Sequence, residues 1–139
     1  MQQVMNSISD KRLHLFVIWL PAISTDSRND ALERSNQFPE DRVSYYWDAE
    51  KLTGKSWDSV LGLGMSAWDI YLLYNSNQNW STEIPSPLFW MHQLQGIEKG
   101  PYLDRDEFKQ KVQELIVQLP QDHSELPGST NLSSESKAE

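Results

Sequence analysis

His92 and Asp69 are the two residues of this sequence whose chemistry is most versatile. His92 lies in the apolar run 88–94 and Asp69 in the run 68–74, which we predict to be partner strands. A histidine next to a carboxylate can transfer protons as a general acid and base. A histidine can also be purely structural, hydrogen-bonded at a sheet edge, and no nucleophile or second ligand accompanies this one. We therefore favour the structural role and keep the Asp69–His92 acid–base pair as the alternative.

Aspartates also mark the ends of two predicted elements. Asp48 and Asp69 each follow a tryptophan, and aspartate commonly caps a helix or a turn. The strand ends of a covered sheet are, however, also places where ligands bind. We expect Asp48 to be a helix cap, whereas Asp69 stays open between a hydrogen-bonding role and a role in a site.

Several other kinds of site are missing from the sequence. The chain has no cysteine, which excludes disulfides, thiolate catalysis and thiolate metal ligands. Its three histidines, His14, His92 and His123, are far apart and form none of the short metal-binding spacings. The glycines of residues 62–66 match neither a nucleophile elbow nor a dinucleotide loop, and we interpret them as the end of a helix. We accordingly expect neither a metal nor a cofactor.

The charge and hydropathy of the chain limit its partners. The formal net charge is −8, whereas a protein that binds nucleic-acid phosphates needs a basic surface. The apolar run 13–23 is about half the length of a membrane span and contains Pro21. Lys11 and Arg12 precede this run, but no clean cleavage site of small residues follows it. We expect a cytoplasmic protein that binds neither nucleic acid nor a membrane, and we interpret the run as a buried strand.

The hydrophobic pattern predicts four strands and three helices. Branched and aromatic residues cluster in short runs that are typical of strands, and the apolar positions from Phe108 to Leu119 recur with helical spacing. Asp104 and Glu107 form a variant capping box at the start of that last helix. The predicted elements are strand 13–20, helix 26–37, strand 43–47, helix 48–61, strand 68–74, strand 88–94 and helix 104–119.

The order of these elements, β-α-β-α-β-β-α, predicts an α/β fold with one four-stranded mixed sheet flanked by three helices. A strand, a helix and a strand within about 35 residues form a βαβ unit with parallel strands. We place strand 13–20 in the centre of the sheet, between strands 43–47 and 68–74. Strand 88–94 then lies at the far edge.

The composition changes along the chain and sets the domain boundaries. Residues 1–12 are polar and lack a period, which predicts a flexible lead. Residues 13–119 form the single α/β domain. Residues 120–139 are rich in Ser, Pro, Gly and Glu, which predicts a disordered tail.

The strings VIWLP, RVSYYWD, AWDIYLLY and PLFWMHQL, together with Trp80 in the long loop, resemble segments of uncharacterised bacterial thioredoxin-like proteins. The resemblance covers about residues 13–119 and implies a thioredoxin fold. Thioredoxins carry a CxxC motif after the first core strand and a cis-proline before the third. Here the first position reads Trp19 to Ser24 without a cysteine, and the second reads Ser66-Ala67 without a proline. The resemblance therefore implies the fold but excludes thiol–disulfide oxidoreductase activity, because dithiol chemistry needs a thiolate.

The resemblance also implies where a partner would bind. In redox relatives the loop after the first strand meets the segment before the third, and together they bind extended chains. The residues implied here are Pro21, Ala22, Ile23, Ser24, Ser66, Ala67 and Trp68. We predict a non-catalytic module that binds a protein or peptide by adding it as a strand, with the acid–base enzyme as the alternative. The partner, the pathway and the oligomeric state stay open.

Overall fold

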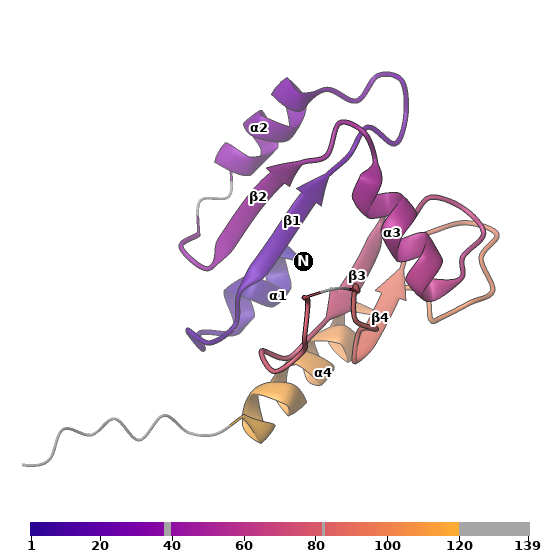
Figure 1. Cartoon of the computed structure of the whole chain (residues 1–139). Helices are drawn as coiled ribbons and strands as arrows, with labels where there is room; N and C mark the ends of the chain where they lie inside the picture. The colour runs from indigo at the N-terminus through magenta and orange to yellow at the C-terminus, as the bar shows by residue number, and fades with distance from the viewer. Residues whose placement is uncertain (38–39, 82, 120–139) are drawn as a thin grey trace, which may run out of the picture.

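The computed structural model describes residues 1–37, 40–81 and 83–119 (Figure 1). From β1 onward, the type and order of the elements follow the predicted β-α-β-α-β-β-α. None of the helices in these ranges combines the length and apolar character that a membrane crossing demands. The elements are α1 (Gln2–Ser7), β1 (Leu15–Trp19), α2 (Arg28–Asn36), β2 (Val43–Trp47), α3 (Leu52–Leu61), β3 (Ile70–Leu73), β4 (Phe89–His92) and α4 (Arg105–Gln118).

The four strands form two separate sheets and not the single four-stranded sheet that the sequence indicated. β1 pairs with β2 in parallel, with Val17 opposite Tyr45. β3 pairs with β4 in antiparallel fashion, with Tyr71 opposite Met91. Within the described residues no strand pairing joins β1 to β3. The predicted four-stranded thioredoxin-like sheet, with strand 13–20 at its centre, is therefore wrong.

Helix α1 supplies a physical reason for the divided sheet. Residues 1–12 were expected to be a flexible lead, but α1 forms there and buries Val4 and Met5. Val4 joins Leu73 of β3 and Met91 of β4 in one core cluster, and Figure 1 shows the N-terminus between β1 and β3. The β3–β4 sheet is therefore joined to α1 by packing of apolar side chains. It is not joined to β1 by backbone hydrogen bonds between strands.

Two apolar clusters form the core, one on each face of the β3–β4 sheet, as the alternation of side chains along a strand requires. The first cluster lies between the sheet, α1 and α4, and its Met91 is 0% exposed. The second contains Leu63, Ala67 and Leu94, with Trp90 packed against it. The core thus belongs mainly to the C-terminal half of the domain.

Among the described residues, helix α2 covers one face of the β1–β2 sheet. Trp19 Nε1 donates a hydrogen bond to Ser35 Oγ of α2 at 3.1 Å, so α2 lies over that face. On the opposite face Phe16 and Tyr46 stack with ring centroids 6.4 Å apart, and both are more than half exposed.

The helix ends follow local signals, with one shift. α4 begins at the predicted cap, where the Asp104 carboxylate accepts from the backbone N–H groups of Asp106 and Glu107. α3 begins at Leu52 and not at Asp48, because Lys51 adopts a left-handed φ of 58° just before it. Residues 120–139, which were predicted to be a disordered tail, lie outside the described residues.

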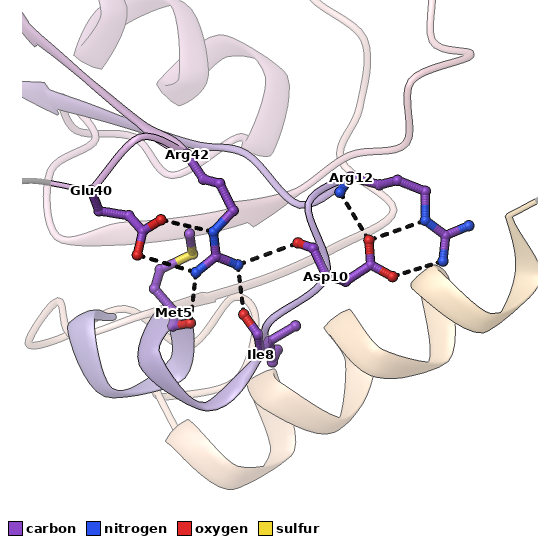
Figure 2. A network of polar contacts seen from close by, with 6 residues as sticks. All are labelled: Met5, Ile8, Asp10, Arg12, Glu40 and Arg42. Carbon is purple, nitrogen blue, oxygen red and sulfur yellow. Dashed lines mark hydrogen bonds and ion pairs between the residues drawn. The ribbon is translucent and has the colours of Figure 1, made fainter. Parts of the chain in front are cut away.

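Arg42 fastens the N-terminal segment to the start of β2 (Figure 2). Its guanidinium forms an ion pair with Glu40 at 2.9 Å. The same group donates to the backbone carbonyl oxygens of Met5, Ile8 and Asp10 at 3.2, 2.5 and 3.3 Å. A planar guanidinium can hold several acceptors at once in a fixed geometry, so one side chain positions the whole end of α1.

Candidate functional site

Gly54 of α3 lies close to Ser66 and Ala67 of one predicted segment and to Leu20, the residue that precedes the other. The Gly54 carbonyl oxygen accepts a hydrogen bond from the Ala67 N–H at 2.9 Å. A Cβ atom added to Gly54 would lie 2.5 Å from Ser66 Oγ and 3.5 Å from a methyl carbon of Leu20. Leu20 directly precedes Pro21, so the start of one predicted loop and the body of the other pack against the same turn of α3. We call residues 21–24 and 66–68 the two-loop surface.

Ile23 and Trp68 are the large apolar side chains that this surface exposes. Their exposed fractions are 61% and 40%, whereas Ala67 is 2% exposed within the second core cluster. Pro21 and Ala22 are half-buried, and Ser24 is exposed. An exposed tryptophan that follows a fixed, buried residue has the character of an interface anchor.

Unpaired polar groups lie beside the Trp68 anchor. Ser66 Oγ is shielded from solvent and has no hydrogen-bond partner among the described residues. The backbone N–H and carbonyl groups of Ser66 and Trp68 also make no hydrogen bond within those residues. Of these groups, Ser66 Oγ is the one that the structure shows shielded from solvent, whereas the backbone of the exposed residue Trp68 can bond to water.

Asp26 shapes the other loop. Its Oδ2 accepts from the Ile23 N–H at 2.9 Å, and its own N–H donates to the Ile23 carbonyl oxygen at 3.1 Å. This closed turn fixes the backbone of Ile23 while its side chain remains exposed. These two hydrogen bonds restrain the backbone that carries the exposed Ile23 side chain.

Asp69 and His92 do not form a hydrogen bond with each other. His92 is 1% exposed, and its Nδ1 accepts from the Leu94 N–H at 3.0 Å, so the proton of the neutral ring is on Nε2. That Nε2 is buried without a partner among the described residues, and the ring packs edge-on against Tyr102 at 5.9 Å. Asp69 is exposed, and its Oδ1 accepts from the Tyr71 hydroxyl at 3.4 Å.

Tyr71 links the residue after the Trp68 anchor to β4. Its single hydroxyl proton is donated to Gln93 Oε1 at 2.6 Å, and Asp69 Oδ1 is a second, more distant acceptor at 3.4 Å. Burial, and then the negative charge of Asp69, raise the pKa of Tyr71 to about 12, so the phenol is neutral and can donate. Asp69 itself has a left-handed φ of 52°. The network thus holds an unusual backbone turn at the entrance to β3.

The remaining predicted groups have structural places. Asp48 lies three residues before Lys51, the N-cap position of α3, but it still caps the first turn, since its Oδ2 accepts from the Thr53 N–H at 2.8 Å and from the Thr53 hydroxyl at 2.6 Å. Gly62 ends α3 with a φ of 63°. His14 Nε2 lies 3.0 Å from Ser44 Oγ. No three His, Cys, Asp or Glu side chains of the described part of the chain are grouped to hold a metal.

The sequence did not identify Gly54 or Asp26 as residues that build this surface. A glycine inside a predicted helix is a signal of close packing, and that signal was available. The role of Asp26 had no comparable signal, because an aspartate after Ser-Thr suits a helix cap equally well. In the structure Ser27 is the cap of α2.

Comparison with known proteins finds no matching family model, no similar curated protein and no matching solved structure. The resemblance to thioredoxin-like proteins therefore stays a prediction, and the case for a function depends on the geometry of this chain.

Proposed function

We propose that this protein is a redox-inactive cytoplasmic binding module, which takes up an extended protein or peptide segment on the two-loop surface. The observation that supports the proposal is the close approach of Gly54 to Ser66 and Ala67 on one side and to Leu20, the residue before Pro21, on the other. The exposed Trp68 side chain directly follows Ala67, and the exposed Ile23 side chain comes three residues after Leu20. The absence of cysteine from the whole chain removes dithiol exchange as a function of the same surface.

The energetics of such binding would come from two sources. Burying the exposed parts of Trp68 and Ile23 is favourable by about 25 cal/mol per Å² of apolar surface. Each backbone hydrogen bond to the 66–68 segment would add about 0.5–1.5 kcal/mol. Pre-ordering of both loops, by Gly54 and by Asp26, lowers the conformational cost.

The test is a selection of binders from a random peptide library displayed on phage, with the purified protein immobilised. The selected peptides should bind wild-type protein and lose binding to Trp68→Ala by tenfold or more, because an anchor contributes about 1–4 kcal/mol. Trp80→Ala is the matched control, since Trp80 is 50% exposed on the β3–β4 loop and packs at a tilt against Tyr74, outside the two-loop surface. Peptides that bind both variants equally well would refute the proposal.

The acid–base alternative has no supporting geometry. Asp69 and His92 have separate hydrogen-bond partners. The ring nitrogen of His92 that could donate a proton, Nε2, is buried and has no acceptor among the described residues. A general acid or base must reach the proton that it transfers. We therefore propose no enzymatic activity on these residues.

A further inference from the structure

Two residues of β1 point their backbone groups away from β2. Leu15 donates its N–H to the Arg42 carbonyl oxygen at 2.8 Å, on the β2 side of the strand. In a parallel ladder, every second residue of a strand faces its partner and the residues between face the other way. The N–H and carbonyl groups of Phe16 and Ile18 therefore lie at the outer edge of β1, where they make no hydrogen bond within the described residues.

The outer edge of β1 lacks the usual features that protect an edge strand. Natural edges are commonly interrupted by charged residues, prolines or bulges. The sequence of β1 is LFVIW, without a charge or a proline, and its register with β2 is continuous from Leu15 to Trp19. An apolar edge of this kind is a template for pairing with another extended chain.

Phe16 adds an exposed aromatic side chain to this edge. It is 61% exposed, on the sheet face opposite to Trp19 and α2. Its ring centroid lies 4.8 Å from that of His14 and 6.4 Å from that of Tyr46. A strand added at the edge would place every second side chain beside Phe16, and aromatic or β-branched side chains make favourable pairs with an aromatic ring across a sheet.

The outer edges of the other strands are less open among the described residues. On β2 the outward N–H of Val43 donates to the Glu40 carbonyl oxygen, and on β4 the N–H of His92 donates to the Pro101 carbonyl oxygen. Residues 70–72 of β3 are half-buried. The edge of β1 combines free backbone groups with a strongly exposed side chain.

We propose that β1 takes up an extended segment of another protein as an additional strand, with an aromatic or β-branched side chain of that segment packed against Phe16. This surface is separate from the two-loop surface. A second copy of the chain fits less well, because it carries the same net charge of −8. The chain's own residues 120–139 contain only two large apolar residues, Leu126 and Leu132, with a Pro-Gly pair after the first, and Pro and Gly disfavour strands.

The test selects peptides from a random phage library on immobilised Trp68→Ala protein, which lacks the anchor of the two-loop surface. We expect peptides with alternating apolar residues that bind wild-type and Trp68→Ala protein equally well. A synthetic copy of the strongest peptide should slow deuterium exchange of the Phe16 and Ile18 amides by about tenfold or more. The Leu15 amide is the internal reference, because it is already hydrogen-bonded to Arg42, and its exchange should change much less.

Two substitutions remove the features of the edge separately. Ile18→Pro deletes an outward N–H, and an edge strand tolerates proline at such a position. Phe16→Thr removes the ring and keeps a residue that favours strands. Each should weaken peptide binding by about tenfold, the upper range for one hydrogen bond or one apolar anchor. Leu32→Ala is the control, because Leu32 is 58% exposed on α2, and it should leave the affinity unchanged.

Loss of affinity in both edge variants, with Leu32→Ala unaffected, supports the proposal. Peptides that ignore both edge variants, unchanged exchange of the Phe16 and Ile18 amides, or a selection that returns no peptide overturns it. A dimer that Ile18→Pro abolishes would assign the edge to a second copy and also overturn it. Edge-binding peptides recovered on wild-type protein are recognised by their loss of binding to Ile18→Pro, so the two-loop surface is tested separately by the Trp68-dependent peptides.

Discussion

Glycine at position 54 permits a contact that a larger residue would prevent. Alanine is preferred to glycine inside a helix by about 1 kcal/mol, so local propensity alone argues against this residue. A Cβ atom there would, however, lie 2.8 Å from the Ala67 carbonyl oxygen, which is backbone and cannot move without shifting the loop. The local cost of glycine is offset by the close approach of α3 to the segment that presents Trp68.

Tyr71 makes a testable link between charge and stability at the residue scale. Its pKa is raised to about 12 by burial and by Asp69, which means that folding favours the neutral phenol. The stabilising contribution is therefore fully present below about pH 10 and is lost as the pH rises through 12. We predict that the unfolding midpoint in urea falls over this range, while Tyr71→Phe loses less of its stability there.

The change can be followed by the ultraviolet absorption of tyrosinate, with Tyr46→Phe as the control because Tyr46 is 53% exposed. At neutral pH, Tyr71→Phe should be less stable than wild type by about 0.5–1.5 kcal/mol, the usual contribution of one hydrogen bond. A Tyr71 that titrates together with the exposed tyrosines would contradict the burial of its phenol and its closeness to Asp69.

At the scale of elements, α1 depends on contacts that its own sequence does not supply. It has six residues and no side-chain cap, and a helix of that length is not stable by itself in water. Burial of Val4 and Met5 and the hydrogen bonds from Arg42 hold it in place (Figure 2). The helix is thus a product of tertiary contacts.

We predict that Arg42→Lys lowers the urea midpoint of unfolding and loosens α1. The guanidinium uses different nitrogens, Nη1 for Ile8 and Nη2 for Met5. Lysine keeps the charge and three donors, but all of them are on one nitrogen without the planar fork, so we expect fewer of these hydrogen bonds to persist. Amide hydrogen exchange within residues 2–8 should accelerate more than exchange in α4. Arg12→Lys is the control, because Arg12 pairs with Asp10 at a more exposed position and surface pairs contribute little. If Arg42→Lys and Arg12→Lys lowered the urea midpoint equally, the hydrogen bonds from Arg42 would not be what holds α1 in place.

At the scale of the whole molecule, the core is unevenly distributed. β4 contains the fully buried Met91 and His92, whereas the strands of the β1–β2 sheet contain no residue as fully buried. Stability within a protein follows the local density of buried contacts. The two sheets are therefore expected to open with different free energies.

We predict that backbone amides of β4 exchange with deuterium at least about tenfold more slowly than those of β1 and β2. Exchange is measured at native pH, with rates corrected for the intrinsic rate of each sequence. The hydrogen-bonded N–H of His92 is a suitable reporter for β4, and that of Leu15 for the β1–β2 sheet. Uniform protection of both sheets would mean that the strands unfold as one cooperative unit.

Local sequence signals predicted most elements but not their assembly. Asp104 with Glu107, the glycine at 62 and the β-branched and aromatic run 43–47 each carry a short-range signal, and each appears where it was expected. Sheet pairing between distant strands depends instead on which side chains compete for the same contact. The mostly polar sequence of residues 1–12 gave no sign that a helix would form there, that Val4 and Met5 would be buried, or that Val4 would pack against Leu73 of β3.

The sequence by itself determined the helices and strands from 13 onward, the acidic charge and the lack of any thiol chemistry, since these depend on residue types and their spacing. The tertiary structure alone decided that the strands divide into two sheets, that α1 belongs to the core and that Gly54 packs closely against Leu20 and the 66–67 segment. Those outcomes depend on packing between residues that are far apart in the chain. Gly54 allows α3 to approach the 66–67 segment because it has no Cβ atom, and the guanidinium of Arg42 holds the end of α1 beside β2.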